Sequence, residues 1–235
     1  MTMIQRNINS VIFDFNGVIV NDSWLHERAW FDIFKELSPS KCSIEFVKKT
    51  IHGRINRDIF EILLSRSVST DELNYLSDCK ESRYRELFDE NISQMQVNES
   101  AKELFDHLKK LKIPFTIATA SGLDNLKFFF ERLNLYKWFD FDKVAYDNGR
   151  VRGKPHPDVY LKAAEKIKVN IDSCLVIEDA VSGVISAKSA GAAYIIGFGD
   201  SFPSKLLIEN GANVVIESFD LFPYGLLRNE YNSIG

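Results

Sequence analysis

Polar side chains that could carry chemistry stand in four short segments, and three of these segments lie at the end of an apolar run. In VIFDFNGV (residues 11–18), three apolar residues lead directly into an aspartate, and a glycine that permits a sharp turn follows. FTIATAS ends in hydroxyl side chains, GKPHPDVY carries a lysine ahead of a predicted helix, and CLVIEDAVSG carries two adjacent acids. The candidate residues of these four segments are Asp14, Asn16, Thr119, Ala120, Ser121, Lys154, Glu178 and Asp179.

Together these residue types are suited to transferring a phosphoryl group. Asp14 and Asp179 offer the hard oxygen ligands that Mg²⁺ prefers, and Lys154 adds a second positive charge. The hydroxyl of Thr119 and neighbouring N–H groups can hydrogen-bond the phosphoryl oxygens, while a carboxylate can attack phosphorus. Each feature also has a structural explanation, because acids cap helices and lysines are solvated. Four such clusters in one chain favour the functional interpretation.

The spacing of apolar residues predicts an α/β fold with a Rossmann-like, mostly parallel sheet. Apolar runs alternate with helical patterns, as expected when helices connect parallel strands. The predicted strands cover 11–15, 115–119, 174–177, 194–198 and 213–216, and the predicted helices cover about 98–112, 122–133, 157–168, 181–190 and 203–210.

One long segment interrupts this alternation. From about residue 23 to residue 91 the sequence shows only helical patterns, such as SWLHERAWFDIFKEL and RDIFEILLSR. A crossover of that length predicts a separate helical domain over 21–94, inserted into an α/β core formed by 1–20 and 95–235. The insertion leaves just after the first strand, and ligand sites in open α/β sheets lie beyond the carboxyl ends of strands. We therefore expect it to act as a lid.

The segments DFNGV, ATAS, GKPHPD and IEDAVSG, in this order, resemble the four motifs of the haloacid dehalogenase superfamily. The helical insertion resembles the cap of its β-phosphoglucomutase-like subgroup. The resemblance implies that Asp14 is the nucleophile and that Thr119 and Lys154 bind the phosphoryl group. It also implies that Asp179, helped by Glu178 and the main-chain carbonyl of Asn16, holds Mg²⁺.

The same resemblance assigns substrate-facing roles in the insertion. DSWLHERAW matches a segment whose histidine approaches the active site, here His26, and CKESRYREL matches one whose lysine faces the substrate, here Lys80. Gly53 matches a specificity loop, beside which Arg54, Asn56 and Arg57 could read the substrate's non-reacting end. The alternatives are an ordinary hydrogen bond for His26 and solvated charges for Arg57 and Lys80.

The chain departs from the family at Asn16, where most phosphatases and mutases have a second aspartate. That carboxyl protonates the leaving oxygen and then deprotonates the attacking water, and an amide can do neither. Three readings remain open: a substrate with a good leaving group, a proton supplied by His26, or lost turnover with retained phosphate binding. Asn16-Gly17 is also a dipeptide prone to deamidation.

Charge, cysteine content and hydropathy limit the classes of function that the chain can have. The formal net charge is -4, with no basic stretch, which disfavours nucleic acid and anionic membranes. The three cysteines are scattered along the chain without a C-x-x-C spacing, which is typical of reduced thiols. We see no signal peptide or membrane span, so we expect a cytoplasmic monomer or weak homodimer.

The leading interpretation is a Mg²⁺-dependent phosphatase of a small phosphorylated metabolite; alternatives are an impaired phosphate-binding relative or a phosphosugar mutase. Phosphonoacetaldehyde hydrolysis needs a lysine where Asn56 stands, and dehalogenation does not require the acidic pair.

Overall fold

The computed structural model describes residues 8–51, 56–150 and 152–227. The chain divides into two compact units, residues 1–20 with 97–235, and residues 21–96. The boundary after the insertion thus lies two residues beyond the expected 94/95 position. None of the described helices is long and apolar enough to cross a membrane.

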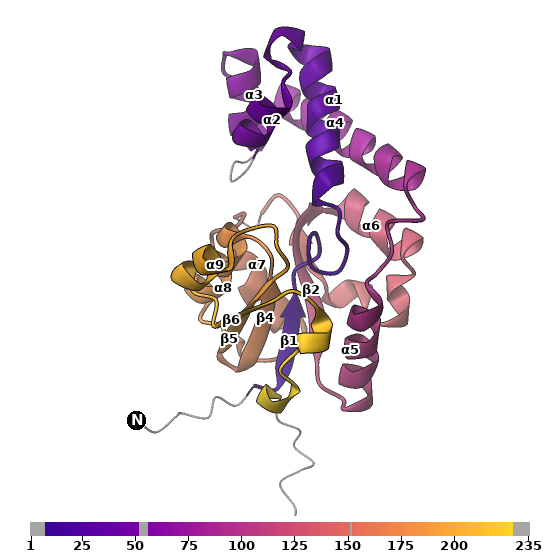
Figure 1. The fold of residues 1–235 in the computed structure, drawn as a ribbon, viewed down its shortest axis with the longest axis vertical. Helices are drawn as coiled ribbons and strands as arrows, with labels where there is room; N and C mark the ends of the chain where they lie inside the picture. Colours follow the sequence, from indigo (N-terminus) through magenta and orange to yellow (C-terminus); the bar gives the residue numbers. More distant parts are fainter. Residues whose placement is uncertain (1–7, 52–55, 151, 228–235) are drawn as a thin grey trace, which may run out of the picture. The chain divides into compact units, whose positions relative to one another are not determined.

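The first unit is built on a parallel six-stranded sheet with the order β3-β2-β1-β4-β5-β6. Figure 1 labels β1, β2, β4, β5 and β6 of this sheet. The strands are β1 (Ser10–Phe13), β2 (Phe115–Gly122), β3 (Ala145–Asp147), β4 (Cys174–Glu178), β5 (Tyr194–Phe198) and β6 (Val214–Ile216). This confirms the predicted α/β fold class. Strand β3 was not predicted, because its three residues AYD at the sheet edge form no apolar run.

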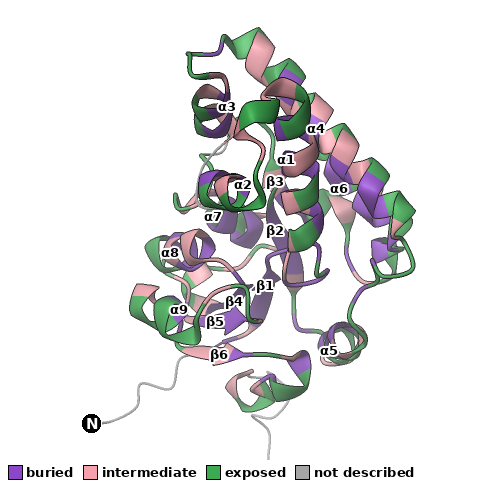
Figure 2. Cartoon of the chain, turned by 45° about the horizontal axis from the view of Figure 1, so that its top comes forward, coloured by how far each residue is buried: buried purple, intermediate pink, exposed green. Residues whose placement is uncertain are grey.

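Helices cover the sheet on both faces, which buries its central strands. The helices of this unit are α5 (Glu99–Lys110), α6 (Leu123–Arg132), α7 (Asp158–Lys166), α8 (Val181–Ala190) and α9 (Ser204–Asn210). All residues of β1 and β4 are buried (Figure 2). A strand buried from both sides is mostly apolar, which explains the uninterrupted runs VIF and CLVI. Ser10 and Glu178, at opposite ends of β1 and β4, are the buried polar residues of these two strands.

Alternating side chains of β1 and β4 pack into two different layers. Ile12 pairs in register with Val176, and both belong to a core cluster that includes residues of α7 and α8. Phe13 instead packs edge-to-face on Phe105 of α5, with ring centroids 5.1 Å apart. This register aligns the ends of the two strands, so that the residues following each strand leave the sheet together.

The second unit is helical, as expected for the insertion, and has its own core. Its helices are α1 (Ser23–Leu37), α2 (Ile44–Ile51), α3 (Asn56–Leu64) and α4 (Thr70–Glu90). Buried apolar side chains of all four helices form one cluster, centred on aromatic residues such as Trp30 and Phe60, whose ring centroids lie 5.0 Å apart. Ser69 is the N-cap of helix α4, and its hydroxyl accepts a hydrogen bond from the N–H of Glu72.

Candidate active site

The carboxyl ends of β1, β2 and β4 bring the predicted site residues of the first unit together. These three strands are neighbours and run parallel, so their carboxyl ends share one edge of the sheet. Asp14 follows β1 immediately, and its N–H donates to the carbonyl of Ile177 in β4 at 2.9 Å. Asp14 and Asp179 are each only 7% exposed. Two carboxylates are therefore held close together with little water.

Lys154 joins the two acidic segments. Its Nζ lies 2.6 Å from Oδ1 of Asp14 and also donates to Oε1 of Glu178. Burial and the Glu178 carboxylate raise the pKa of Asp14 to about 7, against the opposing effect of Lys154. Burial disfavours the charged lysine, but Asp14 and Glu178 outweigh it and hold the pKa of Lys154 above its usual range. The pair keeps a lysine cation next to the candidate nucleophile.

Glu178 is held by three donors. Besides Lys154, the hydroxyl of the fully buried Tyr160 donates to Oε1 at 2.5 Å, and the N–H of Ala180 donates to Oε2 at 3.2 Å. Both carboxylate oxygens are thus engaged, which positions Glu178 to orient Lys154. Sequence reasoning did not single out Tyr160, although it is the last residue of the motif GKPHPDVY. The available signal was its place in the first turn of the predicted helix that follows Lys154.

The acidic residues provide a donor set that fits a hard cation. Ligand oxygens of Asp14, Glu178 and Asp179 all lie within 4.8 Å of one another, and the three residues are buried. Carboxylate oxygens are preferred ligands of Mg²⁺, which commonly binds one or two carboxylates together with waters. Asp14 and Asp179 would be the direct ligands, because the oxygens of Glu178 already accept from Lys154, Tyr160 and Ala180.

Two glycines make room for these carboxylates. Gly17 has φ +78°, and a Cβ there would lie 2.0 Å from Oδ2 of Asp179. A Cβ on Gly183 would lie 1.8 Å from Oε1 of Glu178. Neither contact is possible, so both positions require glycine for the close approach of an acid. The glycines in DFNGV and EDAVSG therefore shape the candidate cation site.

The end of β2 contributes hydroxyl groups opposite Asn16. Thr119 is fully buried, and its Oγ1 accepts a hydrogen bond from the N–H of Ser121 at 3.0 Å. The hydroxyl of Ser121 donates to Oδ1 of Asn16, also at 3.0 Å. Ala120, between them, is exposed, and it lines a small cavity of about 20 Å³ together with Thr119 and Lys154. Side chains that are more than 100 residues apart thus form one site.

In the second unit, the partly exposed His26, with 26% of its side chain exposed, forms a polar cluster with the buried Lys80 and Asp22. Nζ of Lys80 lies 3.0 Å from Nδ1 of His26, and Nε2 of His26 lies 3.6 Å from Oδ2 of Asp22. The Tyr84 ring stacks on the imidazole with centroids 4.1 Å apart, and its hydroxyl donates to Asp22. Burial and the lysine charge lower the pKa of His26 to about 4. Because an ammonium only donates, Nδ1 accepts and the imidazole proton lies on Nε2.

The other insertion residues lie in varied surroundings. Lys80 is 4% exposed and pairs with Glu81 at 2.9 Å, so the interpretation as a solvated charge was wrong for it. Arg57 instead donates to the carbonyl of Val68 at 2.8 Å. The Asn56 amide contacts the Ser77 hydroxyl at 3.3 Å. Gly53 and Arg54 lie outside the described residues.

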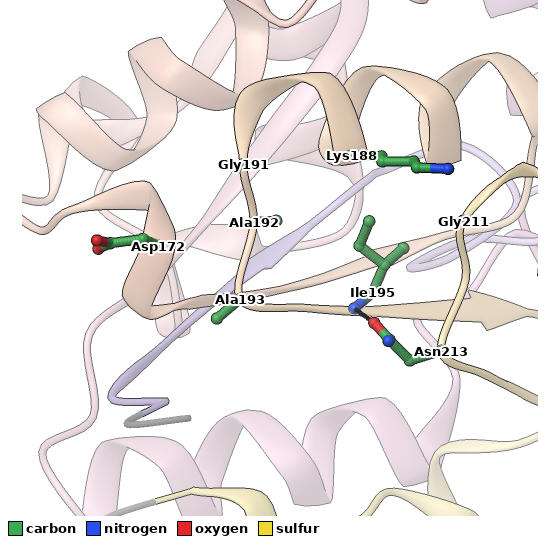
Figure 3. Close-up of a pocket in the computed structure, with 8 residues that line it drawn as sticks. All are labelled: Asp172, Lys188, Gly191, Ala192, Ala193, Ile195, Gly211 and Asn213. Atoms are coloured by element: carbon green, nitrogen blue, oxygen red, sulfur yellow. Dashed lines mark hydrogen bonds between the residues drawn. The ribbon is translucent and has the colours of Figure 1, made fainter. Parts of the chain in front are cut away.

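A larger depression of the first unit lies elsewhere. It has a volume of about 540 Å³ and is lined by residues that precede β4, β5 and β6, among them Asp172, Ala193 and Asn213 (Figure 3). The N–H of Ile195 donates to Oδ1 of Asn213 at 2.8 Å, which supports the loop before β6. The depression holds none of the predicted site residues and lies at the amino ends of these strands, whereas ligands of open α/β sheets bind at the carboxyl ends.

Comparison with known proteins agrees with this geometry. A haloacid dehalogenase-like hydrolase family matches residues 8–191. The chain is 28% identical to the phosphorylated carbohydrates phosphatase of Thermotoga maritima, over 89% of this chain and 94% of that protein. It is 26% identical to β-phosphoglucomutase of Bacillus subtilis, over 95% and 96%. A crystal structure of a HAD hydrolase, family IA, variant 3, from Entamoeba histolytica superimposes with a TM-score of 0.85 at 36% identity, over 91% and 94%. With the motif residues meeting at one sheet edge, these matches establish that the chain is a member of the haloacid dehalogenase-like hydrolase family.

Proposed function

We propose that this protein is a Mg²⁺-dependent phosphatase that acts on a small phosphorylated metabolite through an aspartyl-phosphate on Asp14. The observation that carries the proposal is the contact of Lys154 with Asp14, 2.6 Å apart, within a buried acidic cluster. A carboxylate held next to a lysine cation and a candidate cation site is placed for attack on a dianionic phosphoryl group.

Each residue then has a defined task. An oxygen of Asp14 forms a bond to phosphorus while the bond to the leaving oxygen breaks. Lys154 and the Thr119 hydroxyl hold the phosphoryl oxygens, and Glu178 keeps the lysine in place. When bound, Mg²⁺ would be held by Asp14, Asp179 and the main-chain carbonyl of Asn16, and it would neutralise charge on the phosphoryl group. Water later attacks phosphorus and releases phosphate and the Asp14 carboxylate.

A second candidate is a phosphate-binding relative that has lost turnover. Asn16 favours it, because the position that supplies a general acid and base in the family carries an amide here. The similarity to a phosphoglucomutase also keeps mutase activity as an alternative. A mutase would return the phosphoryl group to a sugar and release no phosphate at steady state.

Phosphate release from a panel of sugar, acyl and aryl phosphates, with and without Mg²⁺, tests the proposal. We expect release that requires Mg²⁺ and disappears in Asp14→Asn and Asp179→Asn. Asp142→Asn is the matched control, because Asp142 is exposed and lies outside the site. Release that survives in Asp14→Asn would contradict an aspartyl-phosphate, and phosphate binding without release would favour the second candidate.

A further inference from the structure

The hydrogen bond between Asn16 and Ser121 fixes the direction in which the Asn16 amide presents its groups. Oδ1 of Asn16 accepts from the Ser121 hydroxyl at 3.0 Å. The main chain of Ser121 is in turn held by Thr119, whose Oγ1 accepts its N–H at 3.0 Å. The carbonyl end of the amide therefore faces β2, and the opposite end is the NH₂ group.

An NH₂ group can donate hydrogen bonds to a substrate, whereas a carboxylic acid can also transfer a proton to it. It has two N–H donors, and it neither gives up nor takes a proton near neutral pH. It can hydrogen-bond an oxygen that already carries negative charge, but it cannot neutralise that charge. An alkoxide leaving group needs a proton as it departs, whereas a carboxylate, phenolate or phosphate does not.

Among the described residues of the insertion, both ring nitrogens of His26 already face other groups. Nδ1 of His26 accepts from Lys80 at 3.0 Å, and its Nε2 lies 3.6 Å from Asp22. Near the nucleophile, the Lys154 ammonium is directed at Asp14 and Glu178, and the Tyr160 hydroxyl at Glu178. Within the described residues, the observed hydrogen bonds thus favour the good-leaving-group reading of Asn16 over the His26 reading.

We propose that Asn16, oriented by Ser121, restricts this enzyme to phosphorylated compounds whose leaving oxygen is stable as an anion, such as acyl phosphates, aryl phosphates and phosphoanhydrides. The proposal rests on the phosphatase function proposed above. Asp14 bonds to phosphorus, the bond to the leaving oxygen breaks, and its electron pair departs on the carboxylate, phenolate or phosphate. The N–H groups of Asn16 stabilise that oxygen, while alkyl phosphates, including sugar phosphates, are poor substrates.

The second half of the reaction is then the slow one. The oxygen of a water molecule bonds to phosphorus, the bond to Asp14 breaks, and the proton of the water goes to solvent because residue 16 cannot take it. General acid–base help of this kind is worth about 10²–10⁴ in rate. The aspartyl-phosphate therefore accumulates. Good substrates release their leaving group in a rapid burst, followed by a common slow rate.

A leaving-group series tests the proposal on native protein and on Asn16→Asp. The probes are aryl phosphates from nitrophenyl to phenyl phosphate, acetyl phosphate and glucose 6-phosphate, all with Mg²⁺. For the native protein we expect kcat/KM to fall steeply as the leaving group becomes more basic, a phenolate burst, and a mass increase of one phosphoryl group on the peptide containing Asp14. Asn16→Asp should flatten the dependence, abolish the burst, and raise turnover of glucose 6-phosphate by about 10²–10⁴.

Variants of Ser121 test whether the orientation of the Asn16 amide, and not only its presence, contributes to catalysis. Ser121→Ala should lower kcat/KM for nitrophenyl phosphate by about tenfold, the equivalent of one hydrogen bond, and Ser121→Thr should restore it because the hydroxyl is kept. Peptide mass must show that residue 16 is still asparagine in the native sample. Circular dichroism checks that each variant is folded.

The outcomes distinguish this proposal from the phosphatase function itself. If native protein and Asn16→Asp show the same leaving-group dependence, or hydrolyse glucose 6-phosphate equally fast, the leaving-group proposal is overturned while the phosphatase stands. Activity in Asn16→Asp alone, with native protein inactive even on acetyl phosphate, also overturns it. If no protein of the series releases phosphate from any probe, the phosphatase function fails as well.

Discussion

The hydroxyl of Tyr160 donates a 2.5 Å hydrogen bond to Oε1 of Glu178, the same carboxylate oxygen that receives Nζ of Lys154. The lysine also lies over the tyrosine ring, 5.2 Å from its centroid. A helix side chain thus positions the acid that positions the lysine beside Asp14. This chain of contacts links the start of α7 to the candidate nucleophile.

Tyr160→Phe should reveal how much this positioning contributes. The variant keeps the ring beneath Lys154 and removes only the hydroxyl, which leaves a buried carboxylate with one donor fewer. We expect a loss of about 1–3 kcal/mol in the free energy of unfolding, measured by urea denaturation, and a roughly tenfold lower kcat on a good substrate. Tyr136→Phe is the control, since Tyr136 is 58% exposed. Unchanged kcat in Tyr160→Phe would show that Lys154 needs no such support.

Alanine at Gly17 should abolish binding of the cation. The added Cβ would lie 2.0 Å from the Asp179 carboxylate and would displace it. Gly149→Ala is a matched control, because Gly149 has a similar φ of +74° but nothing within 4 Å of the added carbon. We expect isothermal titration with Mg²⁺ to show no binding for Gly17→Ala and native affinity for Gly149→Ala. Equal affinities in the two variants would exclude Asp179 as a ligand.

The unfolding free energy should depend on His26 below neutral pH. The pKa of His26 is about 4 in the folded protein, against an ordinary value of 6.5. Burial and the charge of Lys80 lower this pKa, and the acids Asp22 and Glu81 offset part of the effect. A depressed histidine pKa stabilises the fold above pH 6.5, and this contribution is lost as the pH falls towards 4. This pKa shift should lower the free energy of unfolding by about 2 kcal/mol between pH 7 and pH 5.

His26→Gln isolates this effect, since glutamine can still accept from Lys80 but does not titrate. Urea denaturation at pH 7 and pH 5 should show a smaller drop in stability for His26→Gln than for native protein. His156→Gln, at an exposed histidine, should behave like native protein. If all three proteins lose the same stability, the imidazole is not held neutral.

The fold should protect Asn16 from deamidation. In that reaction the Gly17 nitrogen attacks Cγ of Asn16 and expels ammonia, and water then opens the resulting succinimide to aspartate or isoaspartate. Here the Gly17 N–H donates to the carbonyl of Val20 at 2.8 Å, and Oδ1 of Asn16 is held by Ser121. Both reacting groups are therefore constrained.

Asn148-Gly149 provides a control within the same chain, because this Asn-Gly pair lies in an exposed loop. Peptide mapping during incubation at mildly alkaline pH should show faster deamidation at Asn148 than at Asn16 in folded protein. In urea the two rates should become similar. Equal rates in the folded state would mean that the contacts of Asn16 give no protection.

Local sequence patterns predicted most strands of the sheet and several residues of the candidate site. Apolar runs identified β1, β2, β4, β5 and β6, because a strand covered on both faces needs apolar residues in succession. A strand's end also marks where a polar side chain enters the site, so Asp14 and Asp179 could be placed from sequence. The short edge strand β3 could not, since three residues carry too little periodicity.

Tertiary structure alone decided how the placed residues combine. Whether Lys80 is solvated or buried depends on the packing of α4 against α1, and the sequence pattern of a single helix does not contain that information. The Ser121–Asn16 hydrogen bond joins residues 105 positions apart, and it exists because parallel β1 and β2 end side by side. Residue types thus set the possible chemistry, whereas the strand register determined which groups meet and in which orientation.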